Sequence, residues 1–195
     1  MRYADDFVVM CPTAQDCEQA QRRIEHVLGR LGLKLHPQKT RRVVLTEGRE
    51  GFDFLGCHMH KRMSGRLWQQ KGLRRYYLQR WPSRKAMNRV RERVRQLTPR
   101  ARCHADVRGV IAQINPVLRG WGQYFSTGNA ANQFIAVDDY VHWRLKRLQV
   151  KRAGRNLKAG RAQHWDREYF ESFGLHRLRG TIRYPGKPPG NRRAA

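Results

Sequence analysis

The hydrophobic and polar positions of the first ten residues predict a β-hairpin. An acidic pair, Asp5 and Asp6, separates two short apolar stretches that are rich in aromatic and β-branched residues, which favour strands. Aspartate also favours turns for reasons of its own, so a polar turn with no further role accounts for the pair as well. We therefore predict a hairpin whose turn carries both carboxylates.

After this hairpin, the pattern predicts one helix followed by strands. Apolar residues recur at steps of three and four over 13–31, where Thr13 can cap the helix and Gly32 can end it. Strands are expected at 43–45 and 52–59. A hairpin, a helix and antiparallel strands make an α+β layer, and we expect the helix to pack on one face of the sheet.

The apolar period of the second half of the chain is helical. Amphipathic helices are expected over 83–97, from about residue 105, and over 134–152, and Pro116 should kink or divide the second of them. Short connections allow three such helices to bury one shared core. Asp138–Asp139, near the start of the third helix, is interpreted as a complement to its dipole.

Charge divides the chain differently from hydrophobicity. Residues 1–60 hold 9 basic and 8 acidic residues, whereas residues 61–195 hold 32 and 7, so nearly all of the net charge of +26 lies in the second part. A strongly basic segment with interleaved aromatic residues most often binds nucleic acid. Nucleic acid is therefore the expected partner of residues 61–195.

Two smaller clusters leave alternatives open. Residues 61–80 place arginines beside Trp68 and two tyrosines, which suits either stacking on unpaired bases or a connector whose rings enter a core. Cys57, His58 and His60 lie close together, but a fourth metal ligand at a standard spacing is missing. We expect the cysteines to be reduced and buried rather than to bind a metal.

The acidic pair can also carry chemistry. Two carboxylates at the edge of a sheet are accessible to Mg²⁺, which takes oxygen ligands. Two such ions can activate an attacking oxygen and stabilise a leaving one during phosphoryl transfer. Lys39, in a later loop, could stabilise a leaving pyrophosphate, although a solvated loop lysine is the simpler interpretation.

Several blocks of the sequence resemble reverse transcriptases. Tyr3–Asp6, followed by an apolar run, is similar to their active-site turn, residues 32–40 to the next block, and residues 51–56 to their primer-grip strand. Residues 115–125 and 139–145 resemble the maturase-specific region, or thumb, of bacterial group II intron-encoded reverse transcriptases. The resemblance covers most of the chain and implies the C-terminal part of such an enzyme.

The resemblance implies an α+β fold in three parts. A partial reverse-transcriptase palm would cover 1–80, an α-helical thumb bundle 81–153, and a basic extension with a disordered end 154–195. The implied function is to bind group II intron RNA for splicing, through phosphates and 2′-hydroxyls. Within a complete enzyme it would also include RNA-directed DNA polymerisation, with a DNA primer or target as a further partner.

The resemblance also implies site residues. Asp5 and Asp6 would hold Mg²⁺ in a two-metal site and, with Lys39 near the incoming nucleotide, would form the catalytic set. The primer grip would comprise Phe54, Leu55 and Gly56, with plain strand packing as the alternative. Basic residues would contact RNA, namely Arg74, Arg75, Arg84, Lys85, Arg89, Arg91, Arg95, Arg119, Arg144, Lys146, Arg147, Lys151 and Arg152.

The same resemblance limits the activity expected of these 195 residues. The resembled enzymes have a further metal-binding aspartate and a fingers region upstream, which have no counterpart here, so we expect no polymerase activity from the chain alone. The alternatives are a free-standing RNA-binding module, a split enzyme completed by a separately encoded fingers–palm chain, and an inactive gene remnant. With no apolar run near the ~20 residues of a membrane span and no secretory signal, we expect a cytoplasmic protein with no membrane partner.

Overall fold

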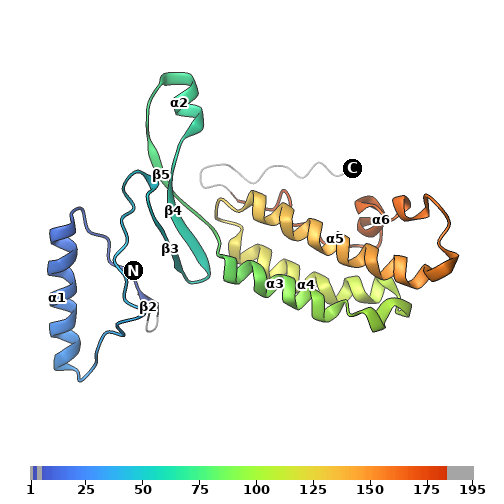
Figure 1. The fold of residues 1–195 in the computed structure, drawn as a ribbon, viewed down its shortest axis with the longest axis horizontal. Coiled ribbons are helices and arrows are strands. Elements are labelled where there is room, and N and C mark those ends of the chain that lie inside the picture. The colour runs from blue at the N-terminus through green and yellow to red at the C-terminus, as the bar shows by residue number, and fades with distance from the viewer. Residues whose placement is uncertain (1, 4–5, 184–195) are drawn as a thin grey trace.

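The computed structural model describes residues 2–3 and 6–183. A short hairpin and one long helix come first, a three-stranded sheet follows, and a bundle of helices completes the described chain (Figure 1). The hairpin pairs β1 (Arg2–Tyr3) with β2 (Asp6–Phe7), antiparallel, with Tyr3 opposite Asp6. The α+β class and the predicted hairpin are therefore confirmed, but Asp6 lies on strand β2 and not in the turn, and Asp5 lies outside the described residues.

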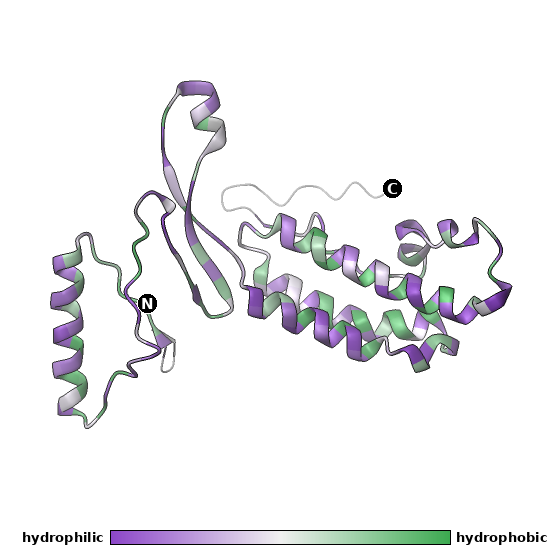
Figure 2. Cartoon of the chain, in the orientation of Figure 1, coloured by the Kyte–Doolittle hydropathy of each residue, from purple (hydrophilic) through white to green (hydrophobic). Residues whose placement is uncertain are grey.

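The first helix forms where it was predicted, but it does not pack on a sheet. In α1 (Ala14–Arg30), Thr13 Oγ1 accepts a hydrogen bond from the backbone N–H of Asp16 at 3.1 Å, so Thr13 is the cap. None of the helix's residues is buried, and Val27 and Leu31 are 56% and 68% exposed. Figure 1 shows α1 set apart from the main sheet, and Figure 2 shows its uncovered hydrophobic positions in green. The expected helix-on-sheet layer is absent from the described residues.

The main sheet corrects two of the strand predictions. Its antiparallel strands are, in order, β3 (Gly51–Phe54), β4 (Cys57–Met63) and β5 (Tyr76–Pro82). The single strand expected over 52–59 is a hairpin instead, because Leu55 and Gly56 have φ of 49° and 75° and form a two-residue turn. Residues 43–45 pair with no strand in the described chain: Val44 N–H donates to the Glu50 carboxylate at 2.9 Å.

Strands β4 and β5 continue beyond β3 as a two-stranded hairpin with a helical tip. The last residue of β4 that faces β3 is His60, which lies opposite Gly51. Beyond it β4 pairs with β5 alone, and the connecting helix α2 (Gly65–Lys71) begins after the capping residue Ser64. This hairpin projects from the sheet in Figure 1. We call its residues 61–80 the arm.

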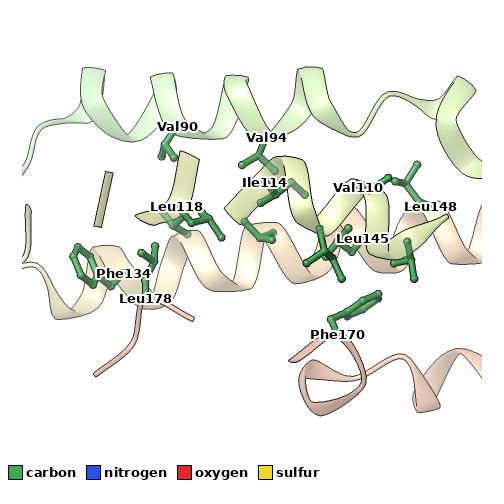
Figure 3. Packing of buried hydrophobic residues seen from close by; sticks show 14 of the residues in the cluster. Val90, Val94, Val110, Ile114, Leu118, Phe134, Leu145, Leu148, Phe170 and Leu178 are labelled. Atoms are coloured by element: carbon green, nitrogen blue, oxygen red, sulfur yellow. The ribbon is translucent and has the colours of Figure 1, made fainter. Parts of the chain in front are cut away.

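Three amphipathic helices form the predicted bundle around one core. They are α3 (Arg84–Leu97), α4 (Val107–Phe125) and α5 (Ala131–Ala153). Ser83 and Asp106 cap α3 and α4, and Pro116 lies inside α4 without dividing it. Figure 3 shows side chains of all three helices meeting in the core, with Val94, Ile114 and Leu145 fully buried. In the described residues, no helix has the length and apolar character needed to cross a membrane.

The segment after α5 also belongs to this core. It contains 3-10 turns at Gly154–Asn156 and Arg161–His164 and a short helix, α6 (Arg167–Ser172). Two further 3-10 turns lie elsewhere in the chain: Thr46–Gly48 precedes β3, and Arg100–His104 precedes α4. Phe170 and Leu178 are fully buried against the bundle (Figure 3). The predicted extension thus completes the core as far as residue 183, and its predicted disordered end lies outside the described residues.

The sequence suggested that Asp138 and Asp139 complement a helix dipole, but the structure gives them a different role. Helix α5 begins at Ala131, so both lie beyond its first turn. Asp138 accepts hydrogen bonds from the backbone N–H groups of Leu178 and Arg179 at 3.0 and 2.9 Å, and Asp139 forms an ion pair with Arg167. Burial raises the pKa of the Asp138 carboxyl. The acidic pair therefore attaches the C-terminal segment to α5.

Candidate nucleic-acid interface

The structure describes two of the three predicted catalytic residues, Asp6 and Lys39. Asp5 lies outside the described residues, whereas Asp6 is an exposed carboxylate on β2. Lys39 is exposed in a turn, where its backbone N–H donates to the carbonyl of His36 at 3.1 Å. In the described part of the chain, no group of three or more His, Cys, Asp or Glu side chains is placed to hold a metal ion. Asp6 offers the oxygen that Mg²⁺ prefers, but one carboxylate does not make a site.

The predicted primer-grip residues join the sheet to the bundle. Tyr124 Oη donates to the carbonyl of Leu55 at 2.8 Å, and Ser83 N–H donates to the carbonyl of Gly56 at 2.8 Å. Phe54, just before the turn, is buried. The β3–β4 turn is thus held by the C-terminal end of α4 and the cap of α3, which fixes its position relative to the bundle.

The aromatic residues near the end of α4 divide between two contacts. Trp121 packs on Phe125 and Phe134, with ring centroids 4.9 and 5.4 Å apart, so these rings join α4 to α5. Tyr124, by contrast, is 59% exposed and donates its hydroxyl to the carbonyl of Leu55. Its position on α4 places it on the side of the helix that faces the sheet.

A continuous row of cations and rings crosses α3 and α5. The Arg91 guanidinium on α3 lies 5.9 Å from the ring centroid of Tyr140 on α5. The centroids of Tyr140 and Trp143 are 5.8 Å apart, and the Arg147 guanidinium lies 4.7 Å from the Trp143 ring. Trp143 is 45% exposed. We call these four residues the α3–α5 row; they present positive charge and aromatic faces together.

Most of the predicted RNA-binding residues lie on α3, on α5 or on the arm. Arg95 also pairs with Glu92 at 2.8 Å, and Lys146 is half-buried. Lys151 and Arg152 belong to the last turn of α5. The exposed members of the predicted set are Arg74, Arg75, Arg84, Lys85, Arg89, Arg95, Arg119, Arg147, Lys151 and Arg152.

Arg144 has a structural role that sequence reasoning missed. Its Nε donates to Thr98 Oγ1 at 2.9 Å, and its Nη2 donates to the backbone carbonyl of Thr98. These bonds satisfy polar groups at the C-terminal end of α3, where carbonyls lack helical partners. The Arg144 side chain is half-buried, and these bonds join α5 to the end of α3.

A second group of rings covers one face of the sheet. His58 and His60 stack with centroids 6.0 Å apart, and His58 lies 5.1 Å from Trp81. The Asp53 carboxylate lies 2.6 Å from His58 Nδ1. Cys57 is on the opposite face, since strand side chains alternate, and burial raises its thiol pKa, which disfavours the thiolate that binds metals.

Sequence reasoning named the cations of the interface but missed the rings that contact them. Tyr140, Trp143 and Arg147 are separated by three and four residues on one helix. That spacing places side chains on one helix face, so it is a signal that could have identified the α3–α5 row. The contact of Arg91 with Tyr140 joins two helices and could not be found in this way.

Two family models match the chain. Residues 1–59 match the model of the reverse transcriptase (RNA-dependent DNA polymerase) family, and residues 87–170 match that of the group II intron, maturase-specific domain. No curated protein matches the chain. Residues 61–80, the arm, lie outside both matches.

Proposed function

The chain belongs to the group II intron reverse transcriptase and maturase family, and we propose that it binds structured group II intron RNA through the exposed basic and aromatic residues of its helical bundle. In this proposal residues 1–80 are palm, 81–153 are thumb, and the residues from 154 onward support the thumb. The observation that carries the proposal is the α3–α5 row, in which guanidiniums and an exposed indole lie in contact.

The chemistry of this surface matches RNA better than an acidic protein. Arginine donates paired N–H groups to phosphate oxygens and also stacks on planar rings. Arg84, two turns before Arg91 on α3, and Lys151, one turn after Arg147 on α5, are exposed cations on the same helix faces as the row. Trp143 adds a ring face that a folded RNA can contact with an unstacked base. Together these groups support binding to phosphates and bases on one surface.

Salt dependence of binding tests the proposal. We expect the affinity for labelled group II intron RNA to fall steeply as salt rises, with a slope that reports the number of phosphate contacts. The triple variant Arg84→Gln, Arg147→Gln, Lys151→Gln should reduce that slope by up to about 0.9 per lost contact. A flat salt dependence in the unaltered chain would contradict the proposal.

A matched control separates a surface from net charge. The triple variant Arg22→Gln, Arg23→Gln, Arg30→Gln removes the same number of charges from exposed positions of α1. If the bundle surface binds the RNA, this control keeps nearly all of the affinity and slope. Equal losses in both triple variants would mean that net charge alone accounts for binding, and the proposed surface would be wrong.

We further propose that RNA-directed DNA polymerisation requires a complete enzyme, to which this chain contributes the acidic turn. Asp5 and Asp6 would supply oxygen ligands for Mg²⁺, which would activate the attacking oxygen, while Lys39 lies near the nucleotide and the β3–β4 turn contacts the DNA primer. These 195 residues are expected to give no primer extension with Mg²⁺. Extension that is lost on Asp5→Ala would contradict this expectation.

A separately encoded fingers–palm chain is the proposed partner for this activity. The uncovered apolar positions of α1, including Val27 and Leu31, support a partner that buries them. Mixing the two chains should restore primer extension and lower amide exchange in α1. The alternative is a free-standing RNA-binding module, favoured by the core being confined to the bundle; it predicts unchanged exchange in α1 and RNA binding unaffected by Asp6→Ala.

A further inference from the structure

The arm exposes side chains that a folded protein usually buries. A two-stranded hairpin has no core of its own and is at best marginally stable in water. The sequence allowed its rings either to bind bases or to enter a core, and the structure leaves them outside the core. Six large residues of the arm are 36% to 49% exposed: Met63, Trp68, Leu73, Tyr76, Tyr77 and Leu78. This concentration of exposed apolar surface indicates a binding site.

The charge of the arm identifies the chemistry of its ligand. The arm contains seven basic residues and no acidic residue, and no acidic residue occurs anywhere from 54 to 91. A ligand must therefore supply negative charge and flat apolar surface at the same place. Single-stranded nucleic acid has both, since each nucleotide pairs a phosphate with a base whose face can stack on an aromatic ring.

Rings and guanidiniums of the arm are already arranged in contact. At the tip, the Arg74 guanidinium lies 5.1 Å from the ring centroid of Trp68. Toward the sheet, the Arg62 guanidinium lies 4.6 Å from the ring of Trp81, and Arg62 is directly opposite Tyr77, so that these three side chains share one face. Cations and rings thus follow one another from the sheet to the tip.

The strand spacing distinguishes unpaired from paired nucleotides. Successive positions on one face of a strand are about 7 Å apart. Stacked bases in a duplex are separated by about 3.4 Å along each strand. Bases that stack on rings of one strand face, such as Tyr77 and Trp81 of β5, must therefore be separated from one another, which an unpaired segment permits and a continuous duplex does not. Trp68 lies farther along the arm, on α2.

We propose that the arm binds unpaired nucleotides, whose bases stack on Trp68 and Tyr77 and whose phosphates contact Arg62 and Arg74. The proposal extends the proposed function and rests on it only in naming intron RNA as the natural source of those nucleotides. The arm lies outside both family matches, so the proposal concerns a part of this chain that those models do not cover.

Fluorescence anisotropy with three labelled probes tests this proposal. The probes are a short unstructured RNA, single-stranded DNA of the same sequence, and the fully paired RNA duplex. Trp68→Ala and Tyr77→Ala should each weaken binding of the single-stranded RNA by about fivefold or more, the low end of base–aromatic stacking, and leave duplex binding nearly unchanged. The two single strands show whether the 2′-hydroxyl contributes.

Control variants make the result specific to stacking. Trp68→Phe and Tyr77→Phe keep a ring and should retain most of the affinity, whereas Leu31→Ala removes exposed apolar surface outside the arm and should have no effect. All of these positions are exposed, so circular dichroism should show unchanged helix content. If the alanine variants weakened the binding of the single strand and of the duplex equally, or weakened neither, the proposal would be wrong. The second result would favour a protein as the ligand of the arm.

The failure of this proposal can be told apart from the failure of the proposed function. The double variant Trp68→Ala, Tyr77→Ala changes no charge, so it should lower single-strand affinity without changing the salt slope measured on intron RNA. The triple variant of the bundle should reduce the salt slope measured on intron RNA and leave the affinity for the short single strand nearly unchanged. A bundle that fails its own test therefore leaves the arm result intact, and an arm that fails leaves the bundle result intact.

Discussion

Helix α1 and the helices of the bundle have the same kind of amphipathic sequence but different surroundings. Helix α1 carries its apolar residues at regular helical steps and buries none of them, whereas α4 buries Ile111, Ile114 and Leu118 among others. The period of the apolar residues therefore specified a helix in both places. What covers the apolar face depends on which other elements lie beside it, and the sequence of one helix does not contain that information.

The largest difference between the two regions should appear when a large apolar side chain is shortened in each. Leu118→Ala, at a fully buried position, is expected to lower the free energy of unfolding by about 2–5 kcal/mol. Leu31→Ala, next to α1, should change it by less than about 0.5 kcal/mol, because Leu31 is exposed. Urea unfolding measures both values. Similar losses would mean that α1 shares the core of the bundle.

The attachment of the C-terminal segment should give the next largest effect. Asp138→Ala leaves the N–H groups of Leu178 and Arg179 without their acceptor, at an expected cost of about 1–3 kcal/mol. Amide exchange over 175–183 should increase. Asp139→Ala removes an exposed ion pair and serves as the control, with an expected cost below about 1 kcal/mol. An equal effect of both variants would contradict the role assigned to Asp138.

The same small change can be made at a helix cap in each region. Ser83→Ala removes the side-chain acceptor of the Ala86 N–H in the bundle, and the expected loss of stability is about 1 kcal/mol. Thr13→Ala removes the equivalent bond to Asp16 and should lower only the helix content of α1. Amide exchange of the Ala86 and Asp16 N–H groups reports on each cap separately, and urea unfolding reports on the stability of the bundle. A shift of the bundle's unfolding by Thr13→Ala would show that the regions are coupled.

The smallest expected effect is a change in how the free energy of unfolding depends on pH. Burial raises the pKa of Asp138 in the folded chain, so the folded state holds this proton more tightly than the unfolded state. Its contribution to stability is therefore fully present below the ordinary aspartate pKa of about 3.9 and is lost as pH rises through the folded pKa. Asp138→Asn does not titrate, so its unfolding free energy relative to the unaltered chain should rise across that window. A constant difference would contradict the assignment.

The bundle was predictable because several local signals agreed. Apolar residues at helical spacing indicated three helices, and Ser83 and the basic last turn of α5 are further signals at the ends of α3 and α5. Such agreement between local preference and packing is typical of segments whose own neighbours bury them. Of the two outcomes expected for Pro116, the division of α4 does not occur.

The errors concern features that depend on distant residues. The turn at Leu55–Gly56 interrupts an apolar run that looked like one strand, and Tyr124 holds it from another part of the chain. The hydrogen bonds of Arg144 to Thr98, 46 residues away along the chain, were likewise not foreseen. A single sequence shows which groups can donate and accept, and it does not show which of them meet after folding. The site roles of Asp6 and Lys39 remain predictions for the same reason.

The burial of Phe170 and Leu178 has a consequence for synthesis of the protein. Both side chains are fully buried: the Phe170 ring lies 5.6 Å from that of His142 on α5, and a methyl group placed on Gly122 of α4 would lie 2.5 Å from Leu178 Cδ2, so the fit between segment and helices is close. A ribosome that has made all three long helices has therefore not yet made the residues that close the space between them. The nascent bundle stays open on that side until translation passes Leu178, and its final packing begins only then.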